Sequence, residues 1–157
     1  MTRMKHILYL LLVLPLLMLG SCNTEDDIDE IFISGTWNVV NYFGKANWEK
    51  RNGEPFYKMY EKEGEQALKI ISTFSITFSK DGTFAGTMQN ATFDGKWQAN
   101  GKDRTIRLTL NGSPNTSPRY NKQFIEYLKD AAFYQGDSNV LLLAPEEKKT
   151  YIQLRHK

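Results

Sequence analysis

The sequence predicts a mainly β (α+β) protein in which antiparallel strands follow one another as a meander. Apolar and polar side chains alternate through residues 74–79 and 105–110, a period of two that is typical of strands with one buried face. We expect a small, partly open barrel or curved sheet with one packed helix near residues 118–132. Dipeptides that favour tight hairpins separate the apolar runs: Asp81-Gly82, Asp94-Gly95 and Asn100-Gly101.

The first residues predict an export signal. Arg3 and Lys5 precede an apolar run of about twelve residues, 7–18, whereas a helix needs about 20 residues to cross a hydrocarbon core. This length and these flanks are typical of a cleavable secretory signal. We therefore assign residues 1–21 to a signal peptide.

Residues 19–22, Leu-Gly-Ser-Cys, resemble the lipobox of bacterial lipoproteins. The resemblance implies cleavage between Ser21 and Cys22 and attachment of lipid to the Cys22 thiol. Cys22 is the only cysteine in the chain, so it has no internal disulfide partner. Because one acyl chain binds membranes weakly, two or three are needed for lasting attachment. The membrane is therefore an expected partner.

An acidic segment follows the cysteine. Residues 23–30 carry five carboxylates and no aromatic ring, so we expect residues 22–33 to form a solvated, lipidated tether. The segment also resembles the surface-export signal of Bacteroidetes lipoproteins, which implies an outer-membrane lipoprotein exposed at the cell surface. The residues themselves leave open which face of the outer membrane it occupies.

The composition of the mature chain excludes one class of partner. Loss of residues 1–21 leaves 18 basic and 18 acidic side chains, so no excess positive charge favours nucleic acid. Residues 34–157 have the length of a single domain, which buries enough surface to fold without disulfides.

The first strand and the segment after it contain the candidate binding residues. Residues 35–43 are predicted to form a strand, with Trp37 and Val39 on one face and Val40 and Tyr42 on the other. Gly35-Thr36-Trp37 is similar to the opening of lipocalin-like barrels.

The segment 44–72 is rich in aromatic and charged residues, and we expect a helix over 54–71 with Pro55 in its first turn. A long insertion of this kind is either a binding loop or a flap over the core. Weak candidates for ligand binding are Trp48, Tyr57 and Tyr60.

The last third of the chain predicts one helix and two closing strands. Ser117 and Pro118 suit a helix start, with serine as the cap and proline at the first helical position. Phe124 and Leu128 follow at helical spacing. Residues 140–143 and 151–155 are apolar or alternating runs that predict strands.

Much of this pattern resembles the META domain of HslJ-type bacterial sequences. The shared residues are the opening Gly-Thr-Trp, the Phe-x-x-Asp-Gly turn at 78–82, Gly95-Lys96-Trp97, and the helical Phe124 and Leu128. The resemblance implies a small β-rich module of unknown function. The two cysteines of that family are absent, so no redox role carries over. A Bacteroidetes lipocalin-like lipoprotein remains the alternative.

Little in the sequence indicates catalysis. A Ser-His or Cys-His pair needs a histidine inside the fold, and the mature chain has only His156, beside its C-terminus. No spacing of His, Cys and carboxylates predicts a metal site, so we expect no catalytic residues, metal or cofactor. Scattered carboxylates leave a carboxylate-based hydrolase as a remote alternative: Glu61, Glu63, Glu65, Asp94, Asp103, Glu126 and Asp130.

Two classes of function remain. The first is a non-catalytic cell-envelope lipoprotein that binds a small ligand, a glycan or a protein partner. The second is a structural or inhibitory subunit of an outer-membrane assembly. A hollow interior of about 300 Å³ or more would favour the first class, and a filled interior with an exposed aromatic patch would favour the second.

Replacement of Cys22 tests the lipid attachment. We expect the wild type to incorporate a palmitate analogue during growth and to partition with membranes, because acylation supplies the membrane affinity. Cys22→Ala removes the acceptor thiol, so its labelling should fall to background. Equal labelling of the two proteins would disprove the assignment.

Overall fold

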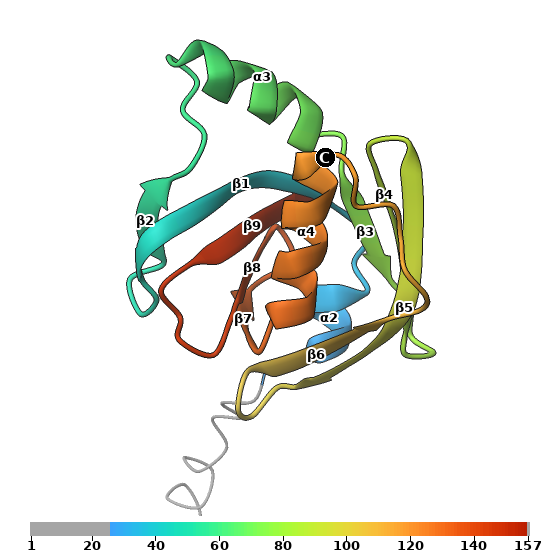
Figure 1. Ribbon diagram of the computed structural model, residues 1–157. Coiled ribbons are helices and arrows are strands. Elements are labelled where there is room, and N and C mark those ends of the chain that lie inside the picture. The colour runs from blue at the N-terminus through green and yellow to red at the C-terminus, as the bar shows by residue number, and fades with distance from the viewer. Residues whose placement is uncertain (1–25, 157) are drawn as a thin grey trace, which may run out of the picture.

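The protein is mainly β, as predicted, and its strands form one antiparallel sheet that closes on itself (Figure 1). The computed structural model describes residues 26–156. Its helices are α2 (Ile28–Phe32), α3 (Lys62–Ile71) and α4 (Arg119–Asp130). Its strands are β1 (Thr36–Asn47), β2 (Asn52–Pro55), β3 (Ser75–Phe78), β4 (Thr83–Met88), β5 (Ala91–Asn100), β6 (Thr105–Leu110), β7 (Phe133–Gly136), β8 (Val140–Ala144) and β9 (Tyr151–His156).

The strands follow one another around a ring. From β3 to β9 each strand pairs with the next, and β1 pairs with both β3 and β9. The ring is weakest between β6 and β7, where the register has one pair, Thr105 with Phe133. Helix α4 packs against this region, in contact with β6 and β8. The expected partly open barrel with one packed helix is therefore confirmed, in the form of an irregular ring.

Helix α4 lies where the 3.6-residue period predicts a helix, although it starts slightly later. Pro118 occupies the cap position without a side-chain hydrogen bond, so the expected Ser117 cap is wrong by one residue. Asn121 is fully buried, and its amide bonds both backbone groups of Gln89, at 3.1 and 2.9 Å. The buried side chains of α4 are Tyr120, Asn121, Phe124, Ile125 and Leu128.

The expected tether over residues 22–33 is wrong at its C-terminal end. Asp27 caps α2 by accepting a hydrogen bond from the Glu30 amide at 3.1 Å. Phe32, on the same helix, is fully buried, and its ring lies 5.2 Å from Phe78 and 4.9 Å from Tyr134. The acidic composition suggested solvation, but two apolar residues at the end of the run are enough to bury this turn. The folded domain therefore includes α2.

Strand β1 does not alternate as the sequence suggested. Its register with β9 shifts between Val39 and Asn41, as expected for a β-bulge. Tyr42 is consequently buried together with Trp37 and Val39 rather than opposite them. The prediction that Trp37 and Val39 share one face is confirmed, whereas the placing of Tyr42 on the other face is wrong.

The helix expected over 54–71 is wrong in its first half. Residues 52–55 form strand β2, in which Pro55 pairs with Phe43 of β1. Helix α3 begins only at Lys62. Proline is tolerated in β2 because this short strand lies at the edge of the sheet.

Truncation of a fully buried tryptophan tests the core. Trp37→Ala removes a ring with no exposed surface and leaves a cavity, so we expect a loss of about 3–5 kcal/mol in the free energy of unfolding. Tyr60→Ala, at a side chain that is 83% exposed, is the control and should change stability little. Chemical denaturation of both variants makes the comparison, and an unchanged midpoint for Trp37→Ala would contradict the packing described.

Candidate functional site

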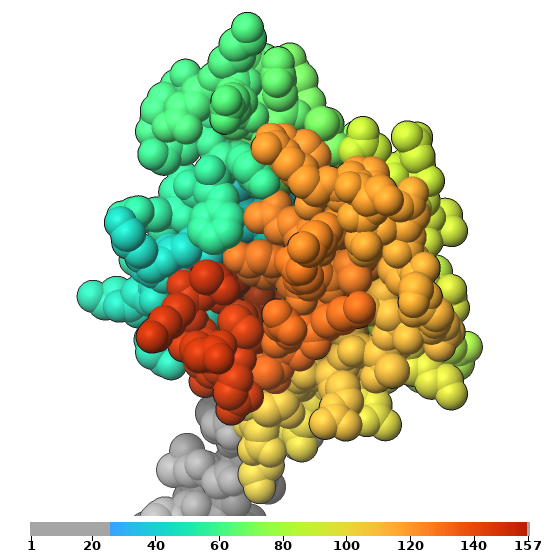
Figure 2. Space-filling view, in the orientation of Figure 1, coloured from blue at the N-terminus to red at the C-terminus, as the bar shows by residue number. Residues whose placement is uncertain are grey.

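The candidate site lies beside β1, where this strand changes neighbours. Residues 36–38 of β1 pair with β3, and pairing with β2 begins only at Phe43. Between these two pairings the chain from Phe56 to Phe74 leaves the sheet, forms α3 and returns. In Figures 1 and 2 this green segment projects from the end of the molecule above β1.

Asn41 ties the departing segment to β1. Its side-chain nitrogen donates to the Tyr57 carbonyl at 2.7 Å, and its side-chain oxygen accepts from the amides of Tyr42 at 2.8 Å and Tyr57 at 3.3 Å. The Phe56 amide donates to the Tyr42 carbonyl at 2.8 Å. The Asn41 amide thus takes the place of a strand backbone and extends the β2 pairing to Tyr57. Both of its polar atoms are satisfied although the residue is buried.

Gly64 fixes the shape of the loop that precedes α3. A Cβ atom at this position would lie 2.2 Å from the Lys58 carbonyl oxygen and 2.6 Å from the Lys58 nitrogen, so only glycine permits the approach. The Glu61 amide donates to the same Lys58 carbonyl at 3.0 Å. The loop therefore packs closely on the first turn of α3.

This geometry leaves an open apolar recess of about 920 Å³ between β1, the loop and α3. Met59 and Tyr60 at its edge are 71% and 83% exposed. Lys69 and Glu65 form an ion pair of 2.8 Å at the rim. The apolar side chains that line the recess include Val39, Val40, Phe43, Met59, Tyr60 and Leu68.

A second recess, of about 470 Å³, lies between the same loop and α4, and its lining combines polar and apolar surface. Tyr57 lines both recesses and donates its hydroxyl proton to the Gln123 side chain at 2.7 Å. Arg119 lies over the Tyr120 ring, 4.6 Å from its centre. Carboxylates and cations face this second recess together: Glu61, Glu63, Arg119, Lys122 and Glu126.

Beneath Tyr57 the core contains a group of tyrosines. The Tyr42 ring lies 6.2 Å from Tyr57 and 4.8 Å from Tyr127. Burial raises the pKa of the Tyr42 hydroxyl far above its ordinary value, and the neighbouring Tyr57 and Tyr127 raise it further. Burial also raises the pKa of Tyr57 and of Tyr127. These hydroxyls stay neutral at physiological pH, and within residues 26–156 the Tyr42 hydroxyl has no hydrogen-bond partner.

The three aromatic residues proposed for binding have different positions. Trp48 is buried in a small cluster with Leu142, Ala144 and Tyr151, so its position is that of a packing residue. Tyr57 and Tyr60 both line the apolar recess. Alternation placed Asn41 on the face of Trp37 and Val39, but no sequence feature indicated that its side-chain amide would bind the backbone of Tyr57. Glycine destabilises a helix interior, so the presence of Gly64 in the expected helix was a sequence feature that indicated a close backbone approach at this position.

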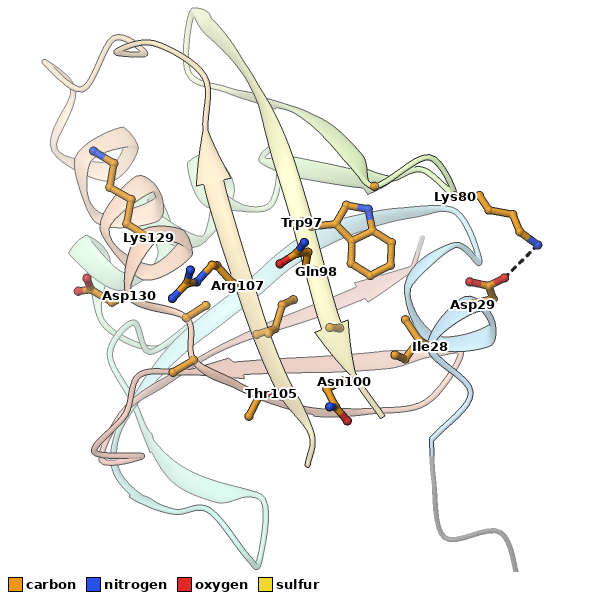
Figure 3. Close-up of a pocket in the computed structure, with 15 residues that line it drawn as sticks. Ile28, Asp29, Lys80, Trp97, Gln98, Asn100, Thr105, Arg107, Lys129 and Asp130 are labelled. Atoms are coloured by element: carbon orange, nitrogen blue, oxygen red, sulfur yellow. Dashed lines mark ion pairs between the residues drawn. The ribbon is translucent and has the colours of Figure 1, made fainter. Parts of the chain in front are cut away.

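A further open recess of about 920 Å³ lies at the other end of the molecule (Figure 3). Trp97 turns toward α2, and Lys80 and Asp29 form an ion pair of 3.0 Å at one side. Lys129 and Asp130 lie at the other side, at the end of α4. Trp97 is buried by α2 and donates to the Ser79 carbonyl at 3.0 Å, so it is a core residue.

His156 has a role in packing that its position near the chain end did not suggest. Its Nε2 lies 2.8 Å from Ser34 Oγ, and its Nδ1 lies 2.9 Å from the Thr36 carbonyl. Its ring is tilted against Trp37 with centres 3.8 Å apart. Because Ser34 Oγ also donates to the Ile31 carbonyl at 2.9 Å, these contacts join the end of β9 to α2.

Two further findings concern the described residues alone. Across residues 26–156, no three His, Cys, Asp or Glu side chains converge closely enough to ligate a metal ion. No helix in that part of the chain has the length and apolar character needed to cross a bilayer. Ser21 and Cys22, the predicted cleavage and lipidation residues, lie outside the described residues.

The fold and the recesses define a class: a small domain with a ring-closed antiparallel sheet and an insertion that forms an exposed face. The chain belongs to the DUF4847 family, whose model matches residues 23–156 and is described as a domain of unknown function. It is similar to a DUF4847 family protein from Bacteroides vulgatus ATCC 8482, known from a crystal structure. The identity is 56% over 83% of this chain and 98% of the other, with a TM-score of 0.79. No curated protein matches the chain.

Loss of the Asn41 side chain tests the connection between the insertion and β1. Asn41→Ala leaves the Tyr57 carbonyl and two amides without their partner, so we expect a loss of about 1–3 kcal/mol in unfolding free energy. Amide exchange at Tyr57 should accelerate as well. Asn38→Ala is the matched control on the same strand, since its one side-chain bond is long, 3.4 Å to the Phe74 carbonyl. Equal effects of the two substitutions would contradict the proposed role of Asn41.

Proposed function

We propose that this chain is a non-catalytic lipoprotein of the cell envelope, held at the outer membrane by lipidated Cys22, which binds a protein partner through the apolar recess. The observation that carries this proposal is the exposure of Met59 and Tyr60 beside that recess. Exposed apolar patches next to a polar rim are typical of interaction sites. The lipobox resemblance supports the attachment.

The filled interior of the ring favours a protein partner over a small apolar ligand. Aromatic side chains from α2, the sheet and α4 fill the interior, and several are fully or almost fully buried. A ligand cavity in a barrel requires space that these rings occupy. The fully or nearly fully buried aromatic residues include Phe32, Trp37, Phe74, Phe78, Phe84 and Phe124. Within residues 26–156 the exposed large apolar residues, Phe56, Met59 and Tyr60, are gathered instead on the insertion. This combination favours the second expected class, in which the protein partner is part of an outer-membrane assembly and this chain is its structural or inhibitory subunit.

A glycan is a second candidate occupant, and the mixed lining of the recess between the loop and α4 favours it. This recess combines aromatic rings with carboxylates, cations and the Gln123 amide. Such a mixture offers both donors and acceptors to a polyhydroxylated ligand. We also propose that the fold is related to the META domain and to lipocalin-like barrels, and the sequential order of the strands supports this relation.

Photo-crosslinking in cells tests the protein partner. A photoreactive residue at position 60, in the apolar recess, should give a discrete protein adduct, because a bound partner covers this side chain. The same residue at Thr109, exposed on β6, is the control and should give none. The Met59→Asp variant places a charge in the recess at a side chain that is 71% exposed, so its adduct should weaken while the fold persists.

The absence of an adduct at position 60, or an equal adduct at position 109, would contradict the proposed partner site. An adduct that depends on added oligosaccharide but not on Met59 would favour the glycan instead.

A further inference from the structure

The mixed recess, of about 470 Å³ between the loop before α3 and helix α4, contains an aromatic side chain whose position is fixed. The Phe56 ring lines this recess and is 44% exposed. The Phe56 amide donates to the Tyr42 carbonyl at 2.8 Å, and a Cβ atom at Gly44 would lie only 2.7 Å from the Phe56 ring. Because β1 holds the residue through both contacts, the ring presents an apolar surface that is already in place when a ligand arrives.

Helix α4 supplies a row of polar side chains to the same recess. The Gln123 side-chain oxygen accepts from the Tyr57 hydroxyl at 2.7 Å, which fixes the orientation of the amide. Across residues 26–156 the Gln123 side-chain nitrogen has no hydrogen-bond partner, so both of its N–H groups can donate to a ligand. The row repeats at intervals of three and four residues, as on one face of a helix: Arg119, Lys122, Gln123 and Glu126.

A second donor and an acceptor of the recess are also available to a ligand. Arg119 donates to the Tyr120 hydroxyl, which uses one of the five N–H groups of a guanidinium. This hydrogen bond raises the pKa of Arg119, and the nearby Glu63 carboxylate adds to the shift. In the part of the chain that the structure describes, Glu63 has no hydrogen-bond partner and forms no ion pair. The recess therefore combines a free carboxylate with free N–H groups.

The charges around the mixed recess balance. Its lining contains three carboxylates and two cations. One of the carboxylates, Glu61, pairs at 3.4 Å with Lys58, which lies outside the lining. A second carboxylate pairs with a cation of α4 across 3.8 Å. The remaining two groups, Glu63 and Arg119, have opposite signs, so no net charge selects an anion or a cation.

We propose that the mixed recess binds a neutral saccharide, whose ring stacks its C–H groups on Phe56 while its hydroxyl groups bond Glu63, Arg119 and Gln123. A hydroxyl group both donates and accepts, so it pairs with a carboxylate and with an N–H group at the same time. A phosphate or carboxylate ligand only accepts and would meet Glu63 with like charge, whereas an ammonium group only donates and would meet the cation Arg119. The volume lies within the range of small-ligand sites, about 300–1,000 Å³.

This inference rests on the glycan candidate of the proposed function and names the class of sugar and the residues that bind it. It does not require a protein in the apolar recess, because Phe56, Glu63, Arg119 and Gln123 line the mixed recess alone.

Binding of the full chain to immobilised oligosaccharides tests the site. The chain is purified in a detergent without a sugar headgroup and applied in parallel to neutral, sulfated and amino oligosaccharides. We expect binding to neutral members only. Phe56→Ala should weaken it about tenfold, because the burial of a phenyl ring is lost. Arg119→Gln, at an exposed position, should weaken it at least about fivefold through loss of a charged hydrogen bond.

Tyr60→Ala is the matched control. Tyr60 is an exposed aromatic residue of the same loop that lies outside the mixed recess, so this variant should bind as the wild type does. Thermal unfolding checks that each variant is folded, and Arg119→Gln decides the outcome if Phe56→Ala is not. Failure to bind any neutral oligosaccharide, preference for the sulfated or amino members, or wild-type binding by Arg119→Gln would overturn the inference.

The saccharide site and the protein partner can fail separately. An adduct at position 60 without saccharide binding would contradict only the saccharide site. Saccharide binding that is lost in Arg119→Gln, without an adduct at position 60, would support this site and contradict only the protein partner.

Discussion

The structure depends on the way in which one strand, β1, pairs with three others. It joins β9 along most of its length and so closes the ring, while its other edge pairs first with β3 and later with β2. A sheet without free long edges resists association through its backbone. The change of neighbour, however, requires the chain to leave the sheet and return. The insertion and its recess follow from that requirement, and the buried amide of Asn41 bridges the place where strand pairing is interrupted.

The interior and the exterior of the ring have separate roles. Phe32 from α2 and the apolar side of α4 complete a core that the sheet alone would leave open between β6 and β7. Filling the ring in this way leaves the external insertion as the place where apolar side chains meet solvent. Within residues 26–156 the domain therefore has a filled apolar interior, and its exposed large apolar side chains lie on the insertion.

The sequence predicted those elements whose pattern is local. Alternation identified β3 and β6, and helical spacing identified α4, because these periods depend on one buried face. It failed where tertiary contacts decide. The bulge at Val40 reverses the expected side of Tyr42, and Phe32 turns part of an acidic run into a core helix. Tyr57 and Tyr60 were proposed by residue type alone, and both line the apolar recess. Trp48 was proposed on the same ground, and its burial could not be predicted because its packing partners lie about a hundred residues later in the chain.

The close contact between Gly64 and the Lys58 backbone has a consequence for engineering and for divergence within the family. Residues 56–64 form a loop whose curvature depends on the close contact between Gly64 and the Lys58 backbone. This contact leaves no room for a side chain at position 64. Substitutions at Met59 or Tyr60 should leave this curvature unaltered, since both side chains are largely exposed. A transplanted loop would keep its shape only if the glycine and the first turn of α3 were moved with it.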